Sequence, residues 1–174
     1  FADKAEIELV EIKDIPVFNK PANKQVPETI LEIAAKIEEA DGVIIGTPEY
    51  DHSIPAVLMS ALAWLSYGIY PLLSKPVMIT GASYGTLGSS RAQLQLRQIL
   101  NSPEIKATVL PDEFLLSHSL QAFDQNGDLV DLDVIKKLDA IFDDFRIFVK
   151  VTEKLRNAQE LLRKDAEDFD WENL

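Results

Sequence analysis

The chain has 174 residues, 47% of them hydrophobic, which is enough for one domain with a sizeable core. Its net charge of −12 comes from 29 acidic and 17 basic residues, a balance that repels nucleic-acid backbones and anionic membrane surfaces. The absence of cysteine excludes disulfides, thiolate metal sites and cysteine nucleophiles.

The N-terminal part predicts no targeting signal and one edge strand. The residues after Phe1 are neither basic nor apolar in the manner of a secretory signal, and prolines interrupt the apolar stretch 54–73, so we expect a cytoplasmic protein without a membrane span. Residues Ile7 to Ile12 partly alternate between apolar and acidic side chains, which predicts a strand near a sheet edge. Residues 14–27 contain three prolines and predict a loop.

The middle of the chain alternates between strand and helix patterns. Helical spacing of apolar residues predicts helices over 28–40, 55–66 and 89–100. Short apolar runs at 42–46 and 76–80 predict strands that are buried on both faces. This rhythm is typical of an α/β fold with a parallel sheet.

The last third adds further sheet segments and a long helix. Apolar runs end at Leu110 and cover 113–119, and Asn126-Gly127 predicts a hairpin turn. A wide apolar stripe predicts a helix over 131–154, whose surplus width suits a subunit contact. We expect one domain over residues 1–155 and a charged helical tail over residues 156–174.

Two loops follow the predicted buried strands and are the expected ligand site. In an open parallel sheet, ligands bind beyond the carboxyl ends of the strands. Residues 46–55 join strand to helix through two prolines, and residues 81–88 contain three glycines. Aromatic surface and backbone N–H groups in these loops suit a planar heteroaromatic ring with a polar edge. Taken singly, each loop is equally well explained as an ordinary strand-to-helix turn.

Taken together, the two loops and the helices after them resemble the NADPH-dependent FMN reductase family of quinone, azo-dye and chromate reductases. The resemblance is carried by GTPEYDHSIPAVLMSALAWLS and then KPVMITGASYGTLGSSRAQLQLRQIL, over about residues 41–100. It implies a flavodoxin-like three-layer α/β sandwich with a parallel sheet of order 2-1-3-4-5, FMN as cofactor, and NADPH or NADH as reductant. It also implies a homodimer or homotetramer that passes a hydride to a small acceptor: a quinone, an azo compound, a metal oxyanion or free flavin.

The resemblance also assigns site residues. It places these residues around the flavin ring: Pro48, Glu49, Tyr50, Asp51, His52, Ser83, Tyr84, Gly85 and Gly88. Tyr50 and His52 are the expected contacts near the acceptor, and no side chain is required as a nucleophile, since the flavin carries the chemistry.

Three features depart from the family pattern. Asp51 replaces the usual asparagine, which puts a carboxylate near the ring and is expected to weaken flavin binding or to disfavour the reduced anionic flavin. Ala63 stands where the family often has aspartate. The family's first strand and the loop that cradles the FMN phosphate have no counterpart after Phe1, so we expect about one βα unit upstream.

Two other functions remain as alternatives. Gly81-Ala-Ser83-Tyr-Gly85 fits the nucleophile pattern of a serine hydrolase, with His118 and Asp112 as partners. A non-catalytic flavin-binding module is the second alternative, because Asp51 and Ala63 depart from the family pattern. No metal site is expected: His52 and His118 lack ligand-spaced partners, and residues 124–128 suit a hairpin better than a calcium loop.

Overall fold

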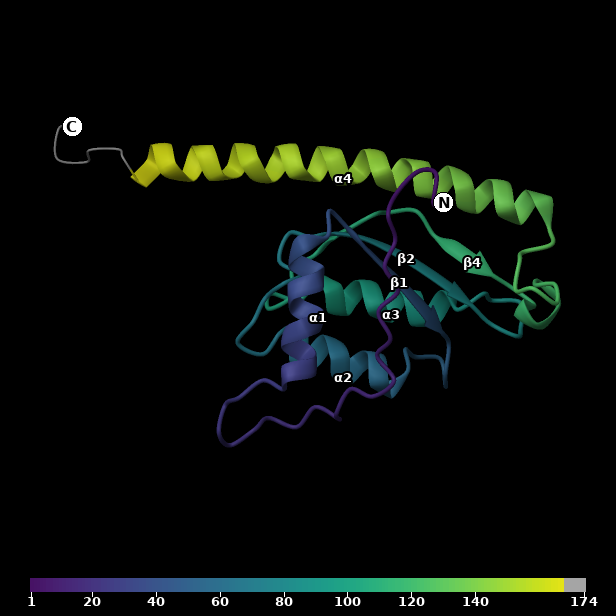
Figure 1. Cartoon of the computed structure of the whole chain (residues 1–174), viewed down its shortest axis with the longest axis horizontal. Helices are drawn as coiled ribbons and strands as arrows, with labels where there is room; N and C mark the ends of the chain where they lie inside the picture. Colours follow the sequence, from purple (N-terminus) through teal and green to yellow (C-terminus); the bar gives the residue numbers. More distant parts are fainter. Residues whose placement is uncertain (168–174) are drawn as a thin grey trace.

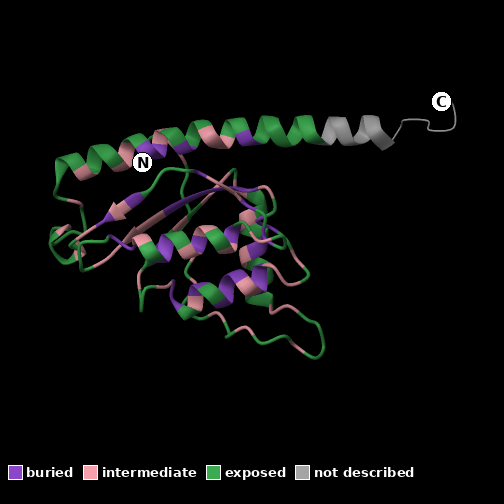
Figure 2. Ribbon diagram, turned by 180° about the vertical axis from the view of Figure 1, so that it is seen from behind, coloured by how far each residue is buried: buried purple, intermediate pink, exposed green. Residues whose placement is uncertain are grey.

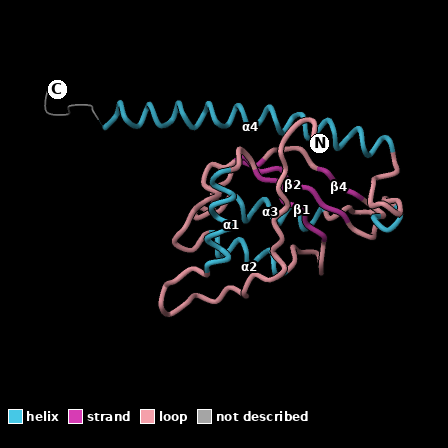
Figure 3. The backbone as a smooth tube through the Cα atoms, viewed as in Figure 1, coloured by secondary structure: helices cyan, strands magenta, loops and turns pink. Residues whose placement is uncertain are grey.

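The computed structural model describes the backbone of residues 1–167 and the side chains of residues 1–159. The helices of this part are α1 (Glu28–Glu39), α2 (Ala56–Leu65), α3 (Ser90–Leu100), the short 3-10 helix η1 (Ser119–Gln121) and α4 (Leu132–Glu167). The strands are β1 (Val43–Pro48), β2 (Pro76–Ala82), β3 (Thr108–Val109) and β4 (Phe114–Leu116). Strands and helices alternate, as the sequence predicted (Figure 3).

All strand pairs in the sheet are parallel, and β2 lies at its centre. β1 pairs with β2 from Val77 to Ala82, with Val43 opposite Val77 and Pro48 opposite Ala82. β3 pairs with the first two residues of β2, and β4 pairs with its last three. Pro111 lies between β3 and β4 and has no N–H to donate, which is consistent with the interruption of the ladder there. The predicted parallel α/β fold is confirmed.

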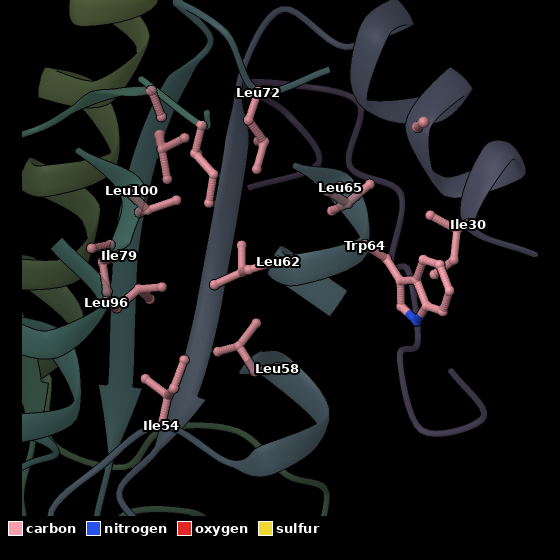
Figure 4. Close-up of a cluster of buried hydrophobic side chains, with 14 of the residues drawn as sticks. Ile30, Ile54, Leu58, Leu62, Trp64, Leu65, Leu72, Ile79, Leu96 and Leu100 are labelled. Carbon is pink, nitrogen blue, oxygen red and sulfur yellow. The ribbon is translucent and has the colours of Figure 1, made fainter. Parts of the chain in front are cut away.

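Helices cover both faces of the sheet, because successive residues of β2 point to opposite sides. Val77 and Ile79 belong to a core with α1, α2 and α3, whereas Met78 belongs to a second core with α4. Figures 1 and 2 show α4 on one side of the sheet and the other three helices on the opposite side. In Figure 4, Leu58 and Leu62 of α2 point toward the strands. The molecule therefore has three layers.

The proline-containing segment 14–27 is a loop, as predicted, and it is fixed to α2. The Trp64 indole donates a hydrogen bond of 2.9 Å to the Pro16 carbonyl, and the Phe18 ring meets Trp64 edge-on at 4.8 Å between centroids. Phe18 N–H also donates to Ser60 Oγ. These contacts tie the N-terminal quarter of the chain to the first core.

The predicted strand at Ile7 to Ile12 is wrong: this segment is extended but pairs with no strand in the described chain. Leu9 is 84% exposed, and within this segment only Ile12 packs on the first core. The alternation of apolar and acidic residues therefore does not indicate a strand here. β1 pairs along one edge only among the described residues. The expectation that β1 is buried on both faces is also wrong, since Ile44 is 40% exposed. The upstream βα unit stays a prediction.

The hairpin and long helix predicted near the C-terminal end are confirmed. Phe123 and Leu129 form an antiparallel bridge, and Asp124 Oδ1 accepts hydrogen bonds from the N–H groups of Asn126 and Asp128. α4 continues through residue 156 without a break, and the predicted tail residues 168–174 lie outside the described residues. No helix in the described part is both long and apolar enough to cross a bilayer.

Candidate active site

Two loops leave the carboxyl ends of β1 and β2 side by side: the 49–55 loop and the 83–89 loop. The last residues of the two strands are direct partners, Thr47 with Gly81 and Pro48 with Ala82. Neighbouring strands lie about 4.8 Å apart, so the loops start within reach of one flat ligand. The sequence predicted this juxtaposition, and the strand register establishes it.

The 49–55 loop contains a tight turn with backbone strain at its tip. Tyr50 and Ser53 exchange two backbone hydrogen bonds, of 3.0 and 2.8 Å. Between them, Asp51 and His52 both have positive φ, 49° and 64°. Two left-handed residues in succession define a type I′ turn, which normally takes Asn-Gly. The turn therefore holds two non-glycine residues in an unfavourable conformation, a feature that clusters at functional sites.

Helix α3 anchors both ends of the 49–55 loop. Glu49 Oε2 accepts hydrogen bonds from the N–H groups of Arg91 (2.9 Å) and Ala92 (3.2 Å) at the start of α3. Ile54 N–H donates to Gln95 Oε1 at 2.8 Å. The strained turn is thus held between two fixed points, and the Glu49 side chain faces α3.

The three glycines at the end of β2 and in the 83–89 loop have different surroundings. A side chain at Gly81 would collide with Ser89 Oγ and the Thr47 carbonyl, so the two strand ends and the start of α3 pack tightly. Gly88 is buried with φ of 57°, and a Cβ there would lie 2.7 Å from the Leu115 carbonyl carbon. By contrast, a Cβ at Gly85 would meet nothing within 4 Å. Gly81 and Gly88 shape the loop, and Gly85 leaves its backbone open.

A third segment, residues 116–119 after β4, supports the 83–89 loop. Ser83 N–H donates to the Leu116 carbonyl and Ser119 N–H to the Ser83 carbonyl, both at 3.0 Å. His118 N–H donates to the Gly85 carbonyl at 3.0 Å, and Ser117 Oγ donates to the Thr86 carbonyl. This segment was not predicted as part of the flavin site. It reaches the same edge because β4 is a third parallel strand, whose carboxyl end lies beside that of β2.

The exposed parts of the two loops offer donors and aromatic surface. Among the described residues, no protein acceptor takes a hydrogen bond from the N–H groups of Asp51, His52, Tyr84, Gly85 or Thr86. The side chains of Tyr50 and Tyr84 are 62% and 74% exposed. A flavin ring presents carbonyl oxygens and ring nitrogens along one edge, so these donors and the open Gly85 backbone fit it.

Two hollows lie away from the loops. One of about 120 Å³ lies between α1 and α4 at the amino end of β2, and one of about 470 Å³ lies between the 123–129 hairpin and α4. The smaller hollow is lined largely by charged side chains, among them Lys75, Asp41 and Arg156. Neither includes residues of the 49–55 or 83–89 loops, and the chemistry described above is confined to those loops.

The arrangement around Ser83 does not match a serine hydrolase. Its hydroxyl donates a hydrogen bond of 3.3 Å to the Gly85 carbonyl, and in the described chain it is not hydrogen-bonded to a histidine. α3 begins at Ser90, seven residues after Ser83, whereas a nucleophile elbow leads directly into its helix.

The model of a family described as NADPH-dependent FMN reductase matches residues 1–121, which include both loops. The chain belongs to this family. It is 49% identical over 173 residues to the NADH:(hydroxy)cinnamate reductase subunit CrdA of Vibrio ruber, a match that covers 99% of this chain and 85% of that protein. It is 46% identical over 160 residues to NADH-dependent flavin reductase subunit 2 of Lactobacillus johnsonii, which covers 88% of this chain and 86% of the relative.

A solved structure gives the same result for the fold. The flavoenzyme NAD(P)H:(acceptor) oxidoreductase FerB of Paracoccus denitrificans superposes with a TM-score of 0.70 at 29% identity, covering 86% of this chain and 81% of that one. The chain is therefore a flavin-dependent oxidoreductase that uses FMN and takes reducing equivalents from NAD(P)H for a small acceptor. This assignment confirms the function predicted from the sequence and removes the hydrolase alternative.

Proposed function

We propose that the flavin ring of FMN binds across the 49–55 and 83–89 loops. The observation that carries this proposal is the pairing of Thr47 with Gly81, which brings two loops with unpaired backbone N–H groups to one edge. The residues proposed to form the site are Pro48, Glu49, Tyr50, Asp51, His52, Ser83, Tyr84, Gly85 and Gly88. Glu49 contributes through its main chain, since its carboxylate faces α3, and Gly88 contributes by shaping the loop.

The protein residues bind and orient, while the cofactor supplies the redox chemistry. When bound, FMN accepts a hydride from NAD(P)H and returns the electrons to an acceptor. Unpaired N–H groups at Asp51, His52 and Tyr84 supply hydrogen bonds to the polar edge of the ring, and their rigid turns keep that geometry fixed. Anchoring by Glu49 and Gln95 prevents the 49–55 loop from relaxing.

The acceptor that suits this edge is planar and aromatic, a quinone or a free flavin. Tyr50 and Tyr84 are exposed on the two loops and provide stacking surface for such a molecule. An oxyanion such as chromate is disfavoured by Asp51 at the tip of the turn and by the net charge of −12. We propose Tyr50 and His52 as the acceptor contacts.

A spectroscopic titration tests the proposal. Protein saturated with FMN is expected to lose its flavin absorbance on addition of NADH or NADPH and to regain it with benzoquinone. The Tyr50→Ala and His52→Ala variants are expected to lose turnover with quinone, whereas Tyr70→Ala, an exposed tyrosine before the amino end of β2, keeps it. Bound flavin that neither nucleotide can bleach would support the non-catalytic module instead, and unchanged turnover in both loop variants would remove the contact role.

A homodimer formed through α4 is the proposed assembly. Ile147, Val151 and Leu155 recur every four residues on α4 and are 61%, 57% and 53% exposed, while Phe145 on another face is buried in the second core. Residues 146–159 contain four basic side chains and one acidic, in a chain of net charge −12. A basic, partly apolar helix that reaches past the body in Figure 1 therefore complements the acidic body of a second copy.

Light scattering during gel filtration tests the assembly. The wild-type protein is expected to elute as a dimer and Leu155→Glu as a monomer, with Val17→Glu, an 82% exposed loop residue, as the matched control. A wild-type monomer at micromolar concentration would overturn the homodimer and turn the search to a different partner chain.

We also propose a cytoplasmic location, which fractionation of the producing cells tests directly.

A further inference from the structure

Glu49 caps a helix to which it does not belong. The first turn of α3 contains no acidic residue, and Ser89, which precedes it, makes no capping hydrogen bond through its side chain. Glu49 fills this place from the 49–55 loop, with one carboxylate oxygen accepting from two successive N–H groups of α3. A carboxylate that accepts two such bonds is a strong, charge-assisted cap.

The capped helix end lies at the edge where the two loops gather. α3 begins immediately after the 83–89 loop, beyond the carboxyl end of β2 (Figure 1). The N-terminus of a helix carries the equivalent of about half a positive charge, and this charge favours anions nearby. Because the carboxylate of Glu49 sits on this end, it cancels a positive field that would otherwise act on any ligand between the loops.

Hydride transfer from NAD(P)H brings two electrons and one proton to a flavin, and so adds one negative charge in the site. A positive helix end favours that added charge, whereas a carboxylate at the same place opposes it. We propose that Glu49 is a positioning residue that also lowers the midpoint potential of bound FMN, by occupying the N-terminus of α3. This inference rests on the proposed location of the flavin.

Two effects of Glu49 have to be separated, its charge and its mechanical hold on the loop. Gln95 offers the matched comparison, because it holds the other end of the same loop through Ile54 N–H and carries no charge. Glu104 offers a second one, since it is an exposed carboxylate just beyond the C-terminal end of α3. Glu49→Gln removes the charge and keeps an acceptor oxygen, Gln95→Ala loosens the loop without changing charge, and Glu104→Gln removes a remote charge.

The midpoint potential of bound FMN is the quantity to measure, by equilibrium titration against a reference dye. Glu49→Gln is expected to raise the preference of the protein for reduced over oxidised FMN about tenfold, or about 30 mV for a two-electron couple. Glu104→Gln is expected to leave this preference within about twofold of the wild type. Gln95→Ala loosens the loop without changing its charge and is expected to shift the preference clearly less than Glu49→Gln does. Ser90→Asp adds an anion at the first residue of α3 and is expected to shift the preference several-fold in the opposite direction.

An unchanged potential in Glu49→Gln, or an equal shift in Gln95→Ala, would overturn the inference and leave the proposed function intact. If Glu49→Gln does not fold, Ser90→Asp alone decides, and no downward shift in that variant would overturn the charge effect. A wild-type protein that does not bind FMN would instead contradict the proposed function itself.

Discussion

Near each end of β2, a charged side chain is hydrogen-bonded to the end of a helix, but the surroundings of the two charges differ. At the amino end, Lys75 is only 6% exposed, and its ammonium donates hydrogen bonds to the carbonyl oxygens of Ala40 (2.7 Å) and Glu38 (3.2 Å) at the end of α1. At the carboxyl end, Glu49 accepts hydrogen bonds from the first N–H groups of α3. In each case a charged side chain complements a helix end of opposite sign.

What separates the two ends is the neighbouring backbone. Around Lys75, two backbone carbonyls accept hydrogen bonds from the ammonium, and the hollow beside it is lined largely by charged side chains. Around Glu49 there is a strained turn, two exposed tyrosines and a run of N–H groups without a protein partner in the described chain. A charge in the first setting serves stability, whereas we propose that a charge in the second acts on a ligand. The ligand end is therefore recognised by its unpaired backbone groups rather than by charge.

Substitution of Lys75 is expected to have the largest effect. Lys75→Met leaves two carbonyls at the end of α1 without a donor, at a cost of about 3 kcal/mol in the free energy of unfolding. Urea denaturation measures the loss, with the exposed Lys20→Met as control. The affinity of the folded variant for FMN is expected to be unchanged, because Lys75 lies at the far end of β2 from the 83–89 loop. A loss below about 1 kcal/mol would contradict the capping role.

The pH dependence of the same variant sharpens the comparison. Burial lowers the pKa of Lys75 below its ordinary value of 10.5, and Arg156 nearby acts in the same direction. The unfolded chain then holds this proton more tightly than the folded one, so stability rises with pH between the lowered pKa and 10.5. The stability difference between the wild type and Lys75→Met is expected to grow over that range. A difference that shrinks instead would contradict the burial of a charged ammonium.

Substitutions of Gly81 in β2 and of Gly85 in the loop after it distinguish an effect on packing from an effect on FMN binding. Gly81→Ala forces a collision with Ser89 Oγ and the Thr47 carbonyl and is expected to cost about 2 kcal/mol of stability. Gly85→Ala meets no atom within 4 Å and is expected to leave stability within about 0.5 kcal/mol, while FMN affinity falls about tenfold. Thermal unfolding and fluorescence titration provide the two values. Equal FMN affinity in Gly85→Ala and the wild type would place the ring elsewhere.

The smallest predicted effect concerns the tip of the 49–55 loop. Asp51 has a φ of 49°, a conformation that asparagine adopts readily in type I′ turns. Asp51→Asn is expected to gain about 0.5 kcal/mol of stability and to bind FMN about threefold more tightly, since it also removes a carboxylate from the ring edge. Denaturation and flavin titration check both values. Weaker FMN binding by this variant would show that Asp51 is a favourable contact.

Much of the fold follows from local patterns, and the failures have a common cause. Helix α1 was predicted almost residue for residue, and strand β2 was predicted from its first residue but ends at Ala82, two residues later than predicted. An amphipathic helix and a buried apolar run each carry their own local pattern. Ile7 to Ile12 alternates like a strand but pairs with none among the described residues, and no local pattern reports the absence of a partner. Ile44 is exposed for the same reason, since burial of β1 depends on what lies along its other edge.

The sequence predicted which loops form the candidate site, but not the hydrogen bonds that hold those loops in place. Strand order and the rule for parallel sheets placed residues 49–55 and 83–89 at one edge. The contact between Glu49 and the start of α3 joins residues 42 positions apart, and that of Ile54 with Gln95 joins residues 41 apart. Neither has a sequence signature, because each depends on how α3 is oriented after it packs. The support from residues 116–119 was missed because β4 is only three residues long.

Amide hydrogen exchange, with and without FMN, tests the central claim most directly. FMN is expected to slow exchange at the amides of residues 51–52 and 84–86, and to leave exchange at the amino end of β2 near Lys75 unchanged. The opposite result is slower amide exchange around the hollow of about 470 Å³, at residues such as Leu129 and Leu138. That result would contradict the binding of FMN across the 49–55 and 83–89 loops.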